Sequence, residues 1–137
     1  MRPRKNVMLY CQCEQITSVT RFILENQVNM GFPGYRVYAS ATEIEITGLI
    51  QTHAQHFFDC AVVIRVSPND ESPRLCSALT AHGLKTLFMN RRGGAIDGGT
   101  VNASAFYSAD IANAEWMDRL RILCARKSGP KKVEAAA

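Results

Sequence analysis

The residues best suited to chemistry are two cysteines and a small set of carboxylates. Cys11 and Cys13 are one residue apart, but no second Cys or His pair stands at the spacing of a zinc site. We therefore favour buried thiols over a metal or redox site. Asp70 and Glu71, with Glu14, could gather a weakly held cation, because hard ions prefer oxygen ligands. Solvated loop charges are the simpler interpretation, so we expect no metal and no cofactor.

Other candidate chemistry is weaker. Gly93-Gly94 and Gly98-Gly99 could approach an anion, but glycine pairs more often mark a loop. We find no Ser-His-Asp set, and no phosphate-cradling or nucleotide-binding glycine motif follows the first expected strand. The chain is therefore not expected to be an enzyme. Free thiols in a reducing compartment are expected for all five cysteines: Cys11, Cys13, Cys60, Cys76 and Cys124.

A continuous apolar run from Phe57 to Val66 is the centre of the expected fold. Its second half is β-branched, and Ser67-Pro68 ends it. Such a run is typical of a strand buried on both faces, as in parallel α/β sheets. Ligands in these folds bind just past the carboxyl ends of the strands. The residues that follow the run should therefore decide the function.

Apolar periodicity and turn residues predict the other elements. Strands are expected at about 7–11, 35–39, 86–89 and 103–107, and helices at about 14–27, 41–55, 73–82 and 112–125. The first helix should carry an apolar stripe of Ile16, Val19, Phe22 and Ile23. The order of strands and helices predicts a doubly wound parallel sheet in three layers.

Local sequence signals mark the start of one helix, both ends of another, and one loop. Ser40 and Glu43 have the spacing of a capping box. Ser72-Pro73 has the form of an N-cap followed by proline, and Gly83 should close that helix. The stretch from Arg91 to Ser104 contains four glycines, so we expect a loop there instead of a full helix.

Composition places the chain among small globular proteins. At 137 residues and 47% hydrophobic content it should form one domain with a substantial core. No apolar run approaches the roughly 20 residues of a membrane helix, and the N-terminus lacks a signal-peptide core. We therefore expect a cytoplasmic protein.

The net charge of +4 is concentrated at the termini. Residues 6–125 hold nine basic and 11 acidic side chains, so the folded body is slightly acidic. The expected organisation is a basic N-terminal extension at 1–5, a folded domain at 6–125, and a basic, then alanine-rich tail at 126–137.

Several short matches resemble the receiver domain of two-component response regulators, including the chemotaxis-protein type. They are Gly34-Tyr35-Arg36-Val37, Phe58-Asp59 before the central strand, Pro68 four residues beyond Ile64, and the closing Ala125 to Lys132. The resemblance spans residues 6–125. It implies a flavodoxin-like, five-stranded parallel sheet of order 2-1-3-4-5. The glycines between 91 and 104 predict that the family's fourth helix is degraded to a loop in this chain.

The resemblance also implies a phosphorylation site, and the chain departs from it at each position. The acidic pair, the phosphoacceptor, the hydroxyl and the lysine of the family fall on Cys11 and Gln12, Ile64, Asn90 and Ser108. An alkyl side chain cannot accept a phosphoryl group, and a thiol with an amide makes a poor magnesium site. Asp59 is the nearest aspartate in the run, but it should lie at the opposite end of the strand.

The sequence therefore predicts a pseudo-receiver in two-component or phosphorelay signalling that is not itself phosphorylated. By the resemblance, its partner would be a signalling protein or a second copy, bound through the last two strands and last helices. The alternative is a nucleic-acid-associated regulator. Four basic residues at 126–132 could contact phosphates, but no aromatic platform or recognition motif accompanies them.

Overall fold

The computed structural model describes residues 4–27, 33–54, 56–91, 96, 101–107 and 111–125. Its elements in chain order are β1 (Lys5–Tyr10), α1 (Glu14–Glu25), β2 (Tyr35–Ser40), α2 (Glu43–Thr52), β3 (Cys60–Arg65), α3 (Ser72–Ala81), β4 (Thr86–Asn90), β5 (Ala105–Tyr107) and α4 (Asn113–Ala125).

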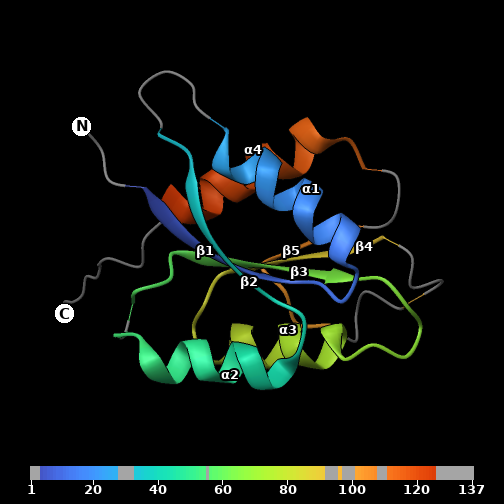
Figure 1. The fold of residues 1–137 in the computed structure, drawn as a ribbon. Helices are drawn as coiled ribbons and strands as arrows, with labels where there is room; N and C mark the ends of the chain where they lie inside the picture. The colour runs from blue at the N-terminus through green and yellow to red at the C-terminus, as the bar shows by residue number, and fades with distance from the viewer. Residues whose placement is uncertain are drawn as a thin grey trace, which may run out of the picture.

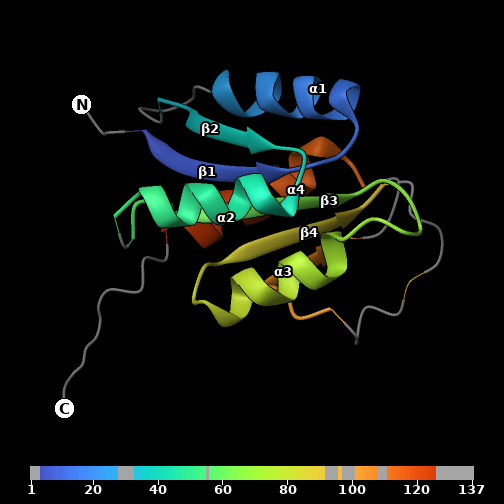
Figure 2. The same ribbon diagram turned by 60° about the horizontal axis from the view of Figure 1, so that its bottom comes forward.

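The five strands form one parallel sheet in the order β2-β1-β3-β4-β5. Helices α1 and α4 cover one face, and α2 and α3 cover the other (Figures 1 and 2). The expected three-layer, flavodoxin-like arrangement is confirmed, with β3 at the centre of the sheet.

Alternation along the strands divides the core into two clusters, one on each face. On the α1 and α4 side, Val62 and Ile64 of β3 pack with Trp116 of α4. On the α2 and α3 side, Ala61 and Val63 pack with α3 residues such as Leu79. All six residues of β3 are buried, which explains why its sequence is a continuous apolar run.

The start of α2 lies two residues later than the capping signal predicted. Thr42, not Ser40, is the N-cap, and its side chain accepts a hydrogen bond from the Glu45 backbone N–H at 3.1 Å. Glu45 in turn accepts from the Ala41 N–H at 2.9 Å. The capping-box chemistry is present, but Ser40 is the last residue of β2 and cannot supply it.

Two glycines hold chain reversals at positive φ. Gly83 (φ 97°) follows α3, where Leu84 N–H donates to the Leu79 carbonyl, so the predicted helix end is confirmed. Gly34 (φ 92°) precedes β2, and a Cβ there would lie 2.7 Å from the backbone oxygen of Glu25. Only glycine lets this strand begin so close to the end of α1.

The predicted stripe of α1 faces the core only in part. Val19 and Phe22 are 60% and 67% exposed, while Ile16 and Ile23 are half-buried. The residues of α1 that are fully buried are Thr20 and Leu24. Helix α1 therefore contacts the sheet mainly through Thr20 and Leu24, with Ile16 packed beside them, and leaves Val19 and Phe22 at the surface.

Parts of the prediction fall on residues that the structure does not describe. Between β4 and β5 it describes Arg91, Ile96 and 101–104, none of them helical. The other residues of the expected loop lie outside the described part, so the loss of a helix there stays a prediction. The same holds for the tail at 126–137. No helix within the described ranges is long and apolar enough to cross a membrane.

Candidate functional site at the carboxyl edge of the sheet

Strands β1, β3 and β4 end at one edge of the sheet, toward which the arrow of β3 points in Figure 1. Arg65 is the last residue of β3 and pairs in register with Asn90, the last residue of β4. Ile64, the residue matched to a phosphoacceptor, is fully buried and packs in the core cluster of α1 and α4. The polar side chain at the end of the central strand is therefore that of Arg65.

Arg65 connects three segments at this edge. Its Nη1 donates to Asn90 Oδ1 at 3.2 Å, and its Nη2 donates to the Pro68 carbonyl at 3.4 Å. Arg65 and Asn90 are only 6% and 8% exposed. A buried guanidinium needs such acceptors, because an uncompensated charge in the interior is costly. The guanidinium ties the ends of β3 and β4 to the loop after β3.

Asp70 is buried and accepts several hydrogen bonds from its own neighbourhood. Its Oδ2 accepts from the backbone N–H groups of Val66 at 2.8 Å and Ser67 at 3.4 Å. Its Oδ1 accepts from the backbone N–H of Ser72 at 3.0 Å and from the Ser72 hydroxyl. The predicted cap by Ser72 is therefore wrong: Ser72 is already inside α3, and Asp70 organises the helix start.

Of the carboxylates proposed as weak cation ligands, Asp70 has a structural role. Both oxygens of Asp70 already accept two hydrogen bonds each, and Glu14 lies exposed in the first turn of α1. Within the described ranges, no group of three or more His, Cys, Asp or Glu residues could hold a metal ion. A guanidinium at the same edge would also repel a divalent cation.

Gln12 and Tyr10 continue the polar network from the end of β1. Gln12 Nε2 donates to the Tyr10 hydroxyl at 2.9 Å, and that hydroxyl donates to Glu71 Oε2 at 3.3 Å. Burial raises the pKa of Tyr10 well above its ordinary value, and the negative charges of Glu71 and Asp70 add to the effect. Tyr10 therefore stays protonated and acts as a hydrogen-bond donor.

Arg74 extends this network to the surface of α2 and α3. It pairs with Glu43 and, at 3.5 Å, with Glu71. The hydrogen bond from Arg74 lowers the pKa of Glu43. The contact is largely exposed, so its contribution to stability is small, but it links the starts of the two helices on this face.

The cysteines do not converge on a metal site. Cys11 is buried, its Sγ lies 3.5 Å from the Cys13 carbonyl oxygen, and burial raises its pKa. Burial also raises the pKa of Cys76 to about 12, and its Sγ donates to the Asn102 carbonyl. Both groups are therefore neutral thiols near pH 7, unsuited to bind metals without losing a proton.

Cys60, at the start of β3, and Cys124, at the end of α4, lie against each other, with a Cα–Cα distance of 5.8 Å that a disulfide could span. The expectation that all five cysteines are free thiols stays a prediction for this pair. Nothing in the sequence pattern indicated that the two side chains meet, because the residues are 64 positions apart and each is also typical of a buried core.

Asp59 lies at the other end of β3, as expected. Its Oδ2 accepts from the Asn6 backbone N–H at 2.7 Å, and its own N–H donates to the Asn6 carbonyl. Ser108, the position matched to the lysine of a receiver, lies outside the described residues, as do the basic residues at 126–132. The residue missed by sequence reasoning is Arg65, whose signal was a charged side chain inside an apolar run.

Comparison with solved structures identifies the fold. The signal receiver domain of a signal transduction histidine kinase from Syntrophus aciditrophicus is 12% identical, with a TM-score of 0.72 over 97% of this chain and 99% of that one. A two-component response regulator of the LuxR family from Aurantimonas sp. SI85-9A1 is 18% identical, with a TM-score of 0.68 over 91% of this chain and 89% of that one. No family model matches the chain, and no curated protein matches it in sequence. By its strand order and these neighbours, the chain has a receiver-like fold.

Proposed function

We propose that this chain is a receiver-like signalling or adaptor protein that acts through protein contacts, without being phosphorylated and without catalysis. The observation that carries the proposal is the contact of Arg65 with Asn90 at the carboxyl edge of the two central strands. Phosphoryl transfer to a receiver would need an accessible carboxylate and a bound cation at this edge. The chain has a buried guanidinium there instead.

The nearby acids do not easily replace a phosphoacceptor. Asp70 is 9% exposed, and its two oxygens accept hydrogen bonds from the loop and the start of α3. Using Asp70 as a nucleophile would disrupt the start of α3. Asp59 is bound to Asn6 at the opposite end of β3. Neither carboxylate therefore fits the role without rearrangement of the strand ends.

The solved neighbours support the signalling half of the proposal. One is described as the receiver domain of a signal transduction histidine kinase and the other as a two-component response regulator. A protein with this fold and a permanent charge at the strand ends would keep β3, β4 and the loop after β3 tied together. Its contact surface would then be constant, and a signalling protein or a second copy would recognise it without a phosphate signal.

The proposal is tested with beryllium fluoride and Mg²⁺, which together mimic an aspartyl phosphate. Backbone amide resonances of the full chain are recorded with and without the mimic. We expect no shifts at Arg65, Asn90 or the residues after β4, because no accessible carboxylate accepts the mimic. Saturable shifts that cluster at this edge, and that vanish in Asp70→Asn, would contradict the proposal.

A further inference from the structure

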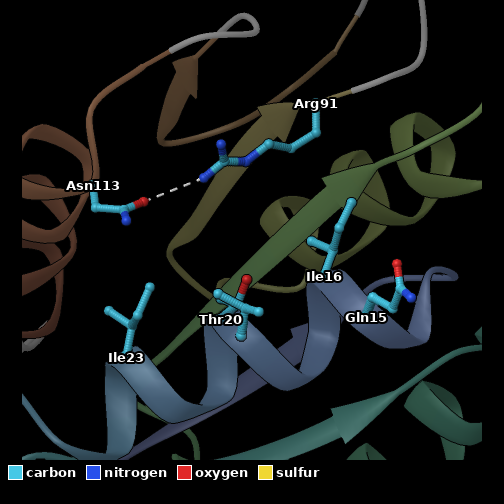
Figure 3. A pocket seen from close by; sticks show the side chains of 7 residues that line it. Gln15, Ile16, Thr20, Ile23, Arg91 and Asn113 are labelled. Atoms are coloured by element: carbon cyan, nitrogen blue, oxygen red, sulfur yellow. Dashed lines mark hydrogen bonds between the residues drawn. The ribbon is translucent and has the colours of Figure 1, made fainter.

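A pocket of about 470 Å³ lies between α1 and the end of β4, beside the carboxyl edge of the sheet (Figure 3). Its described lining residues are Gln15, Ile16, Val19, Thr20, Ile23, Arg91 and Asn113. One wall comes from α1, and the opposite side comes from the end of β4 and the start of α4. The volume falls in the range of about 300–1,000 Å³ that is usual for small-molecule sites.

The α1 wall is largely aliphatic, with Gln15 and Thr20 as its polar members. Ile16, Thr20 and Ile23 point from α1 toward Arg91 and Asn113 in Figure 3. Val19 lines the same pocket and is 60% exposed, so the core of the protein does not use it. From residue 16 to residue 23 the helix rises about 10 Å, which gives an extended apolar track with an open mouth.

The opposite side carries a cation with weak internal partners. Arg91 Nη2 reaches Asn113 Oδ1 only at 3.5 Å, the long limit of a hydrogen bond. That same oxygen accepts from Trp116 Nε1 at the shorter distance of 3.0 Å. The Nε of Arg91 is buried and has no hydrogen-bond partner in the part of the chain that the structure describes.

No acidic residue is among the seven described lining residues. Among the described residues, the pocket therefore combines a guanidinium that has no acidic partner with a largely aliphatic wall. A ligand that complements both must carry an anionic group at one end and an apolar body behind it. A carboxylate suits the guanidinium best, because the two can share paired N–H···O bonds.

We propose that this pocket binds a small carboxylate with an aliphatic body. The carboxylate pairs with Arg91, and the hydrocarbon chain lies along Ile16, Val19 and Ile23. The ligand displaces the long Arg91–Asn113 contact and leaves Asn113 bonded to Trp116. The site does not depend on whether the protein can be phosphorylated.

Sodium octanoate is the probe for this site, added to the full chain and followed by calorimetry. The fluorescence of Trp116, the one tryptophan of the sequence, gives a second readout because its indole bonds to Asn113. We expect saturable binding with a dissociation constant below about 1 mM. Octylammonium has the same chain with the opposite charge, and acetate has the anion without the chain, so both should bind at least about tenfold more weakly.

Two variants locate the site. Arg91→Gln should weaken octanoate binding at least about tenfold, because it removes the charge that pairs with the carboxylate. Val19→Glu places a carboxylate at the mouth of the pocket, where it repels the carboxylate of octanoate, and should weaken binding by a similar factor. The matched control is Phe22→Glu, which changes a residue of similar exposure (67%) that does not line the pocket, and which should leave binding within about twofold.

Three results would overturn the proposal. The first is no saturable signal up to about 10 mM octanoate. The second is binding that Arg91→Gln and Val19→Glu leave unchanged. The third is binding of octylammonium with the same affinity as octanoate, because the guanidinium would then not favour an anionic ligand over a cationic one. If octanoate fails but an acidic, leucine-rich peptide binds with dependence on Arg91, the pocket is a contact for a partner protein and not a small-molecule site.

Discussion

The guanidinium of Arg65 donates to the side chain of Asn90 at 3.2 Å, across the two central strands at their carboxyl ends. Both residues are nearly buried, and Arg65 also reaches the carbonyl of Pro68. The contact connects the strand end to the loop that leads into α3. In this chain the edge of the sheet is therefore held by a fixed cation and an amide.

Removing the guanidinium should destabilise the protein. Arg65→Met takes away the donor to Asn90 and Pro68 while retaining an apolar stem. We expect the free energy of unfolding to fall by about 2–3 kcal/mol, as for hydrogen bonds to charged groups. Urea unfolding measures the change. Arg36→Met, at an exposed position of β2, is the control and should stay within about 0.5 kcal/mol. Equal effects of the two substitutions would show that the buried contact is not stabilising.

Asp70 should behave as a structural cap and not as a metal ligand. Asp70→Ala removes the acceptor of four hydrogen bonds, so we expect a loss of about 2–3 kcal/mol in unfolding free energy. Asp70→Asn keeps one acceptor oxygen and should lose less. Thermal unfolding with and without millimolar Mg²⁺ completes the test. A rise in melting temperature with Mg²⁺ that Asp70→Asn abolishes would assign the carboxylate to a cation site.

Stability should fall at alkaline pH, in part through Tyr35. Burial raises the pKa of Tyr35 from 10.0 to about 12 in the folded protein, against the lowering effect of Arg121. Below pH 10 the residue is protonated in both states and has no effect on the pH dependence. Between pH 10 and about 12 the unfolded chain loses the proton first, so stability decreases as pH rises.

Tyr35→Phe should make the decline in unfolding free energy between pH 9 and pH 11.5 shallower than in the parent protein. The slope is the readout, because the substitution can also shift stability uniformly. Part of the decline should remain in the variant, because burial also raises the pKa values of Tyr10 and Cys76. Identical slopes in the two proteins would show that Tyr35 does not contribute.

Oxidation should join Cys60 and Cys124, which the structure places against each other. After treatment with an oxidant, denatured protein should react with maleimide at three cysteines, Cys11, Cys13 and Cys76, and after reduction at five. Five reactive thiols after the oxidant treatment would show that the pair does not form a disulfide.

Once formed by oxidation, a disulfide between Cys60 and Cys124 should also affect stability. It closes a separation of 64 residues, so the chain-entropy model gives about 4 kcal/mol of stabilisation for the oxidised protein. Reductant should lower the urea midpoint of the parent protein but not that of Cys124→Ser.

Periodicity and turn residues were sufficient to predict the order of the elements, the central strand and the helix end at Gly83. These three features depend on residues close together in the sequence, whose hydrophobic periodicity and turn glycines can be recognised directly. The start of α2 was misplaced because Ser40 and Thr42 both offer hydroxyls, and only the end of β2 decides between them. In α1, the sequence could not tell which apolar residues face the sheet.

The site was harder to predict. Ile64 and Arg65 are neighbours, and only the register of β3 on β4 decides which of them lies opposite Asn90. The role of Asp70 depends on the turn between β3 and α3, whose backbone amides converge on its carboxylate. Both features are tertiary, so no spacing rule in a single sequence could have supplied them.

The most direct test of the central claim is intact mass after incubation of the full chain with acetyl phosphate and Mg²⁺. The account predicts no added phosphoryl group, because a guanidinium lies at the end of β3 and the oxygens of Asp70 cap α3. A single added phosphoryl group that is lost in Asp70→Asn or Asp59→Asn would contradict it and would make this chain a working receiver.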